Sequence, residues 1–359
     1  MLEMLQTNNL YEVGKVCIGD FELESGVHLK DVEVAYERVG NLYGDSIIVC
    51  HALTGNHLTV GTSVSPGWWR DLIGPSRYID TNKYNVITMN VLGGCSGSTG
   101  PTSINPETGK KYRGDFPTIT IRDIVHSHKR ALEKIGVTEV LSIIGGSLGG
   151  MQVLEWGILY PHFAKHLIPM AVTPTLSDYG IAFNTIGRHA IQNDPAWNNG
   201  FYEEQSIKGL EVARMVGLVT YRSQRLFNNR FQREKKNASQ YQIDSYLKYQ
   251  GEKFVKRFDA NSYLCLLQAM DSFDIGFKRH GIEKALKNIE SSLTMVAFSH
   301  DLLYPPTVIE ETVLLLKRVG KVANYIYVQT DFGHDGFLVE FEKFGTEISL
   351  QLQTVLQTR

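Results

Sequence analysis

Long apolar runs are absent from this sequence. No window approaches the roughly 20 consecutive apolar residues that a membrane-spanning helix requires, which argues against an integral membrane protein. The first residues, MLEMLQTNNLYEV, have neither a basic start nor an apolar stretch of roughly 7 to 15 residues, so no secretion signal is predicted. We therefore expect a soluble, cytoplasmic protein.

Cysteine is scarce as well. The four cysteines, Cys17, Cys50, Cys95 and Cys265, lie far apart and show no C-x-x-C or Cys/His ligand spacing. They predict neither a disulfide framework nor a metal site, and we expect reduced thiols. No metal is expected elsewhere in the chain.

An excess of charge of either sign is also missing. Lys and Arg number 36 against 38 Asp and Glu, which gives a net charge of −2. This balance removes the electrostatic argument for binding nucleic acid or an anionic membrane, so small molecules are the expected partners. With 359 residues, of which 43% are hydrophobic and 21% charged, the chain can bury a large core.

What the sequence does contain is a series of short, continuous apolar runs. Such runs predict strands buried on both faces, as in a parallel sheet covered by helices. Helical periodicity at 122–135 and 307–319 alternates with them. The pattern predicts an α/β fold with a mostly parallel central sheet. The apolar runs lie at 46–50, 85–90, 140–144, 166–172, 293–298 and 324–329.

Strand-like runs stop between about residues 176 and 290, where helical segments dominate a more polar stretch. The simplest topology is a sheet core formed by residues 1–175 and 291–359, with a helical insertion at 176–290 that acts as a lid. The charged stretch at 228–240 is interpreted as solvated surface of this insertion.

The segment GGSLG, residues 145–149, places Ser147 between pairs of glycines at the junction of a buried strand and a helix. This is the context in which G-x-S-x-G forms a nucleophile elbow, a turn too tight for bulky neighbours that lifts the serine hydroxyl above the sheet. A structural turn is the alternative. As a nucleophile, Ser147 would have the backbone N–H of Leu148 beside it as one oxyanion donor.

A serine nucleophile needs a histidine base and a carboxylate that orients it, in the chain order Ser, acid, His for this fold class. Asp301 and His334 each follow a predicted strand, at the sheet edge where open α/β sheets build sites. Their neighbours His300 and Asp331 are the alternatives.

The second oxyanion donor is expected from the loop after an earlier strand. The segment at 47–55, IIVCHALTG, is such a loop, and the N–H of Leu53 is the candidate, with Ala52 or Thr54 as alternatives. The alternative is that this segment is an ordinary strand exit, in which none of these N–H groups has an oxyanion role.

The glycine-rich stretch GGCSGSTGP at 93–101 lacks the lysine and the spacing of a phosphate-binding loop, so we interpret it as a wall of the site. Cys95, within it, has no nearby base and is predicted to be a structural thiol rather than a nucleophile.

Together these residues resemble the homoserine O-acyltransferases of the α/β-hydrolase superfamily, and among them the homoserine O-acetyltransferase type. The resemblance extends over nearly the whole chain, and lid-like helical segments at 213–223 and 259–274 share it. The segments that carry it are HALTG at 51–55, NVLGGCSGSTGP at 90–101, FPTITIRD at 116–123, GGSLGGMQVLEW at 145–156 and FGHDGFLVE at 332–340.

The resemblance implies the α/β-hydrolase fold, Ser147 as nucleophile, His334 as base and Asp301 as its orienter. It also implies that Arg214 and Asp335 hold the amino-acid substrate. The alternative for Asp335 is a helix N-terminal residue that interacts with the helix dipole.

The residues around Arg214 agree with this role. Apolar or small residues lie three or four positions away on the predicted helix, so the guanidinium projects from a largely apolar face and requires an anion. A substrate carboxylate suits it, because arginine binds carboxylates through two parallel hydrogen bonds. A carboxylate of the protein is the alternative partner.

The activity that the resemblance implies is transfer of an acetyl group from acetyl-CoA to L-homoserine through an acyl-serine, on the route to methionine. Acetyl-CoA is then a co-substrate, no cofactor is bound permanently, and a homodimer through the lid helices is expected. Succinyl-CoA as donor, L-serine as acceptor and a serine esterase of the same fold are the alternatives. A non-catalytic scaffold is a further alternative, against which the complete Ser, Asp, His set argues.

Overall fold

One sheet of eight strands forms the centre of the computed structural model, which describes residues 9–203 and 207–357. The strand order is β1-β2-β6-β3-β7-β8-β9-β10. β1, β2 and β6 pair antiparallel, whereas every neighbouring pair from β6 to β10 is parallel. The strands are β1 Asn9–Glu22, β2 His28–Asn41, β3 Ser46–Cys50, β6 Asn85–Met89, β7 Val140–Gly146, β8 Ala164–Met170, β9 Ser292–Phe298 and β10 Ala323–Val328.

The predicted α/β fold with a mostly parallel sheet is confirmed, and the apolar runs correspond to β3 and β6 to β10. The antiparallel hairpin of β1 and β2 was not predicted. β1 lies at the edge of the sheet and alternates exposed with partly buried residues, and Tyr11 and Val13 remain exposed. β2 is largely buried in its second half, but Glu37 and Arg38 interrupt its apolar sequence. A search for continuous apolar runs therefore overlooks them.

Helices cover both faces of the sheet and create a core on each side. On one face α2 and α9 pack against the parallel strands and α1 packs on α2 and against β1 and β2, and on the other face α11 packs together with the segment around Trp69. β4 (Ile73–Gly74) and β5 (Ile79–Asp80) form a separate short ladder on that second face. These helices are α1 Ile121–Lys134, α2 Leu148–Leu159, α9 Pro306–Arg318 and α11 Phe341–Gln357.

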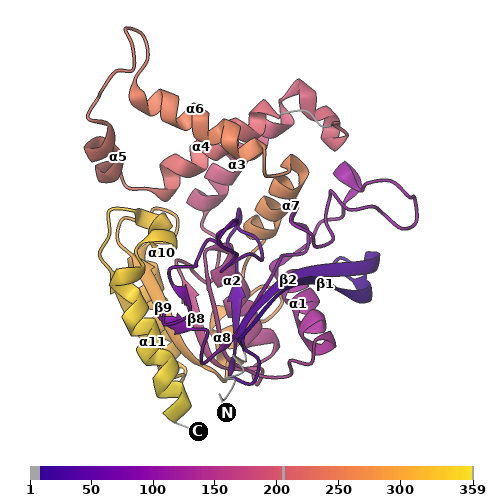
Figure 1. Ribbon diagram of the computed structural model, residues 1–359, viewed down its shortest axis with the longest axis vertical. Coiled ribbons are helices and arrows are strands. Elements are labelled where there is room, and N and C mark those ends of the chain that lie inside the picture. Colours follow the sequence, from indigo (N-terminus) through magenta and orange to yellow (C-terminus); the bar gives the residue numbers. More distant parts are fainter. Residues whose placement is uncertain (1–8, 204–206, 358–359) are drawn as a thin grey trace, which may run out of the picture.

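Between β8 and β9 the chain forms helices in the predicted insertion, 176–290. α3 packs on α4 and α7, and α4 also packs on α6. Figure 1 shows α3, α4, α5 and α6 stacked beyond one end of the sheet, away from both labelled termini. The last helix, α8, instead packs on α9 beside the sheet. The helices are α3 Asp178–Gln192, α4 Lys208–Tyr221, α5 Gln224–Phe231, α6 Gln242–Val255, α7 Ala260–Asp271 and α8 Ile282–Lys287.

Short helices complete the chain: η1 Arg113–Asp115, η2 Pro195–Gly200, η3 Gly333–Asp335 and α10 Gly336–Val339. Over residues 9–203 and 207–357, no helix has the length and apolar character needed to cross a membrane.

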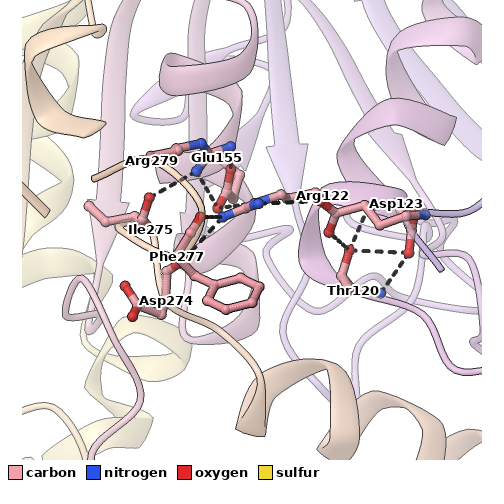
Figure 2. A network of polar contacts seen from close by, with 9 residues as sticks. Thr120, Arg122, Asp123, Glu155, Asp274, Ile275, Phe277 and Arg279 are labelled. Carbon is pink, nitrogen blue, oxygen red and sulfur yellow. Dashed lines mark hydrogen bonds and ion pairs between the residues drawn. The ribbon is translucent and has the colours of Figure 1, made fainter. Parts of the chain in front are cut away.

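A buried ion network joins α1 and α2 to the chain that returns from the lid (Figure 2). Glu155 of α2 is 1% exposed and accepts two hydrogen bonds from Arg279, at 2.6 and 2.9 Å. Arg122 of α1 also contacts Glu155 at 3.3 Å and donates to the carbonyl of Phe277 at 2.8 Å. Because α2 begins directly after Ser147, this network fixes the base of the lid to the helix that follows the predicted nucleophile.

Candidate active site

Ser147 lies at the turn between β7 and α2, as the sequence predicts for a nucleophile elbow. Its backbone has φ 59° and ψ −125°, a conformation that is costly for any residue other than glycine. The serine is therefore held in a strained turn at the amino end of a helix, where the helix dipole favours negative charge.

The glycines around Ser147 are required by close packing. A Cβ atom on Gly145 would lie 2.6 Å from the Cys50 carbonyl oxygen, and one on Gly149 would lie 2.1 Å from the same atom. On Gly146 it would lie 2.5 Å from the Phe337 ring. The elbow is thus wedged between β3 and the helix after His334, and a larger residue at these positions would displace it.

Asp301 and His334 lie on loops that follow the neighbouring strands β9 and β10, and both are buried. His334 Nδ1 is 2.8 Å from Asp301 Oδ2. The other oxygen, Asp301 Oδ1, accepts from the backbone N–H groups of Leu303 and Tyr304 at 2.9 and 3.0 Å. The carboxylate is therefore fixed on both sides, and it can hold the imidazole with Nε2 available as a base.

The environment favours the protonated form of His334. Burial alone would lower the pKa of His334, but the charge of Asp301, the hydrogen bond to it and the charge of Asp335 outweigh burial, so the pKa is raised. A base with a raised pKa accepts a proton more readily from a serine hydroxyl.

Tyr304 lies close to both His334 and Ser147. Its ring stacks on His334 at 5.2 Å, and its fully buried hydroxyl approaches Ser147 without completing a hydrogen bond. Burial and then the charge of Asp301 raise the pKa of Tyr304. No hydrogen bond joins Ser147 Oγ to His334 within the part of the chain that the structure describes. Such contacts often form only once substrate is bound.

The predicted oxyanion donors Leu148 and Leu53 lie on adjoining segments. Neither backbone N–H donates to another group among residues 9–203 and 207–357. The side chain of Gln152, on α2, donates to the His51 carbonyl at 3.2 Å and so ties the Leu53 loop to the helix that starts at Leu148. The role of Leu53, like the choice between it and its neighbours, stays a prediction.

His51 fixes the start of this loop. One ring nitrogen is 2.8 Å from the Ala52 carbonyl, and the other accepts from the Val91 N–H at 3.1 Å. Burial lowers the pKa of His51 to about 4, so the ring is neutral at pH 7 and keeps one donor and one acceptor.

Arg214 of α4 lies with its guanidinium carbon 5.2 Å from the centre of the Phe254 ring. Among the described residues no carboxylate pairs with it, so the internal salt bridge considered above is not formed there. Tyr221 lies two helical turns further along α4, is close enough to feel the charge of Arg214, and has its ring 5.4 Å from His334. Sequence reasoning missed Tyr221, although the seven-residue spacing from Arg214 points to it.

Asp335 is buried beside His334 and forms an ion pair that was not predicted. Arg222 Nε donates to Asp335 Oδ2 at 2.8 Å, and Arg222 Nη1 donates to the hydroxyl of Tyr246 at 2.7 Å. Arg222 directly follows α4, so the lid contributes the cation that pairs with Asp335, the residue predicted to hold the substrate.

The alternatives lie apart from this cluster. His300 is exposed, and Asp331 pairs with Arg225 at 3.3 Å rather than with the catalytic histidine. Burial raises the pKa of the Cys95 thiol, which keeps it protonated, as expected for a structural cysteine. In the described chain no group of three or more His, Cys, Asp or Glu could hold a metal ion.

A cavity of about 760 Å³ lies between the lid and the loop that follows Cys95. Its wall includes basic side chains, of which Lys111, Lys256 and Arg257 have no carboxylate partner in the described chain. Arg257 donates to the carbonyl of Thr54 at 3.0 Å, on the predicted oxyanion loop. The cavity therefore adjoins the candidate site.

Comparisons with known proteins agree with the fold. A family model described as the alpha/beta hydrolase fold matches residues 45–340. The homoserine O-acetyltransferase of Carboxydothermus hydrogenoformans is 42% identical over 368 residues, covering 98% of this chain and 97% of that protein. The crystal structure of homoserine O-acetyltransferase from Bacillus anthracis superposes with a TM-score of 0.91 at 26% identity, covering 96% of this chain and 98% of the other. The structure of esterase E22 superposes with a TM-score of 0.86 at 27% identity, covering 97% and 99%.

Proposed function

Because the chain belongs to the homoserine O-acetyltransferase family of α/β-hydrolase-fold proteins, we propose that it transfers an acetyl group from acetyl-CoA to the hydroxyl of L-homoserine. This places it on the route to methionine. The observation that carries the proposal is the combination of a complete Ser147, Asp301 and His334 set with a lid cation, Arg214, that has no carboxylate partner among the described residues. A triad alone would serve any ester, whereas the cation suits an acceptor that bears a carboxylate.

In the first half-reaction Ser147 Oγ attacks the thioester carbonyl while His334 Nε2 takes its proton. The N–H groups of Leu148 and Leu53 stabilise the oxyanion of the tetrahedral intermediate. When the intermediate collapses, the C–S bond breaks, the CoA sulfur receives the proton from His334, and an acetyl-serine ester remains.

In the second half-reaction L-homoserine binds with its carboxylate on Arg214 and its ammonium on Asp335. His334 takes the proton of the homoserine hydroxyl as its oxygen attacks the ester carbonyl. Collapse of this second intermediate breaks the bond to Ser147, which recovers its proton from His334. The product is O-acetyl-L-homoserine.

Water is the competitor for the acetyl-serine. Transfer prevails when the acceptor hydroxyl is held at attacking geometry, where effective molarities can reach about 10⁵ M or more against roughly 55 M for bulk water. The lid supports this by supplying Arg214 and by covering the site from water. Tyr221, in contact with the His334 ring, contributes part of that cover.

We propose that the cavity of about 760 Å³ receives the nucleotide end of the donor, because it adjoins the oxyanion loop and carries unpaired cations at its wall. Phosphate groups pair with such cations. Lys256→Gln should raise the KM for acetyl-CoA but leave the KM for S-acetylpantetheine unchanged, since the latter lacks the nucleotide. Lys253→Gln, three residues earlier on α6 and outside the cavity wall, is the matched control. Equal effects on both donors would contradict this placement.

A homodimer through the lid helices is also proposed. Exposed apolar side chains on α3 and α4, among them Ile186 and Val219, each 50% exposed, support a contact with a second copy. Light scattering of the purified protein measures the mass directly, and a monomer at micromolar concentration would contradict the proposal. A cytoplasmic location is supported by the cysteines, all of which are unpaired.

The second candidate function is ester hydrolysis, which the similarity to esterase E22 favours. One experiment separates the two. The purified protein is given acetyl-CoA or succinyl-CoA, with and without L-homoserine or L-serine, and CoA release is followed. Transferase activity predicts steady CoA release only with the right acceptor, after a single burst from acylation of Ser147. Release at full rate without acceptor would overturn the proposal in favour of a hydrolase.

A further inference from the structure

The carboxylate of Asp335 does not lie free beside the catalytic histidine, because the lid holds it. The ion pair with Arg222 is largely buried: the side chains are 20% and 13% exposed for Arg222 and Asp335. A pair with this little solvent around it is screened far less than a surface pair, so the attraction between its two charges is stronger.

The pair uses only part of each group. Arg222 contacts Oδ2 through Nε alone, while Nη1 is engaged by the hydroxyl of Tyr246. Asp335 Oδ1 accepts no hydrogen bond from any of the residues described. A carboxylate has acceptor sites on both oxygens, so a second cation can bind without displacing the first.

We propose that Arg222 is a positioning residue for the amino-acid acceptor, holding Asp335 through Oδ2 so that Oδ1 receives the ammonium group. This rests on the proposed function, in which Asp335 binds that ammonium. Arg214 and Arg222, on α4 and immediately after it, then serve the two ends of one zwitterion, the first directly and the second through Asp335.

Contacts of neighbouring residues hold the segment of Arg222 against the loop that carries His334. Ser223 Oγ donates to the carbonyl of Asp331 at 2.5 Å, and a Cβ atom on Gly333 would lie 3.1 Å from the carbonyl oxygen of Tyr221. The chain after α4 therefore lies directly on the loop that carries His334. These contacts hold the backbone of Arg222 beside Asp335, which supports shared rather than competitive binding of the ammonium.

Arg222 also offsets the negative charge of Asp335. The charge of Asp335 is one of the causes that raise the pKa of His334, and the guanidinium offsets it. Without Arg222 the uncompensated carboxylate should raise that pKa further, which would shift the acid limb of the rate profile to higher pH. A role limited to folding would not produce this shift.

The test compares Arg222→Gln with Arg225→Gln. Arg225 is a cation of the same lid segment and pairs with Asp331 on the loop that carries His334, so its replacement leaves Asp335 untouched. For Arg222→Gln we expect the KM for L-homoserine to rise about tenfold or more, equivalent to about 1.4 kcal/mol. The rate of Ser147 acylation by acetyl-CoA should stay within about twofold at a pH above the His334 titration. Arg225→Gln should leave both values unchanged.

Conservative variants check the geometry. Arg222→Lys keeps the charge but cannot bind Asp335 and Tyr246 in the same planar arrangement, so it should restore the KM in part. Tyr246→Phe should raise the KM in the same direction by a smaller factor. Circular dichroism and the melting temperature confirm that each variant folds.

An unchanged or lower KM for L-homoserine in a folded Arg222→Gln protein would overturn the inference, and a lower KM would indicate that Arg222 competes with the ammonium. Equal losses in acylation and in transfer would also overturn it. If the unaltered protein acylates Ser147 but transfers nothing to L-homoserine, the proposed function fails instead. The two failures are therefore distinguishable.

Discussion

Asp301 and His334, which are 33 positions apart in the chain, meet through a bond of 2.8 Å because β9 and β10 are parallel neighbours in the sheet. The loops after both strands emerge at the same sheet edge, beside the turn that carries Ser147 after β7. The parallel register thus brings acid and base together, and the following predictions test what that arrangement does.

Replacing Asp301 with asparagine should lower kcat by roughly 10³- to 10⁴-fold, because the amide no longer holds His334 in the tautomer that leaves Nε2 free, as found for the equivalent change in the serine-protease triad. Single-turnover acylation by acetyl-CoA measures the effect. The matched control is Asp331→Asn, which alters a carboxylate on the same loop as His334 whose ion-pair partner among the described residues is Arg225. Similar losses in the two variants would contradict the assignment of Asp301.

The rate should fall as pH falls through the pKa of His334, since only the neutral ring accepts a proton. Because that pKa is raised above 6.5, the acid limb of kcat/KM should lie above pH 6.5. The same shift means that the folded state binds the proton more tightly than the unfolded one. Its contribution to stability is complete below pH 6.5 and is lost as pH rises through the folded-state pKa. An acid limb at or below 6.5 would contradict this environment for His334.

Arg214→Ala should raise the KM for the acceptor roughly 10- to 100-fold, because the substrate carboxylate loses charged hydrogen bonds. Acylation of Ser147 should be nearly intact, as the donor does not use this cation. Separate measurement of the two half-reactions tests both statements. Lys248→Ala, an exposed cation on α6, should change neither. Equal losses in both half-reactions would argue against a substrate role for Arg214.

A methyl group at Gly146 should disturb both stability and activity, because it would meet the fully buried Phe337 ring at 2.5 Å. We expect Gly146→Ala to cost about 1–3 kcal/mol, as overpacking does, and to shift the loop of His334. Gly187→Ala is the control, since its methyl group would meet Ala213 at an ordinary 3.4 Å and favour the helix. Urea denaturation and specific activity should separate the two, and equal stability would contradict the packing argument.

The network in Figure 2 should be costly to break, because Glu155 is 1% exposed and faces two arginines. Glu155→Gln removes the carboxylate that pairs with Arg279 and leaves Arg122 with Glu24 as its remaining carboxylate partner among the described residues, so it should destabilise the protein by about 3–5 kcal/mol. Glu283→Gln, which breaks exposed pairs with Lys287 and Arg318, should leave the melting temperature nearly unchanged. Thermal melts of both variants give the comparison, and a Glu155→Gln protein as stable as the control would show that the network is unimportant.

Much of the site was predictable because its signals are local. The turn around Ser147 needs glycine on both sides because neighbouring chain lies too close for a Cβ atom, and the glycines that meet this need are adjacent in the sequence. Asp301 and His334 could be proposed because each follows a continuous apolar run, and parallel strands place such loops at one edge. Leu148 follows from Ser147 as the first residue of the helix.

Other features depend on partners that are distant in the chain. Arg222 is one of several lid cations in the sequence, and only the packing of α4 against the loop of His334 selects it as the partner of Asp335. The approach of Tyr304 to Ser147 and the cavity beside Thr54 likewise arise between segments far apart in the chain. No local pattern encodes which side chains meet there.

By itself, then, the sequence determined the strand and helix types, the elbow and the order of the triad, because backbone conformation and apolar periodicity are properties of neighbouring residues. It did not reveal the hairpin of β1 and β2, because β1 is partly exposed and charged residues interrupt the apolar sequence of β2. The tertiary structure alone decided which charges pair across the lid, because those contacts depend on how separate elements pack and not on the residues beside them.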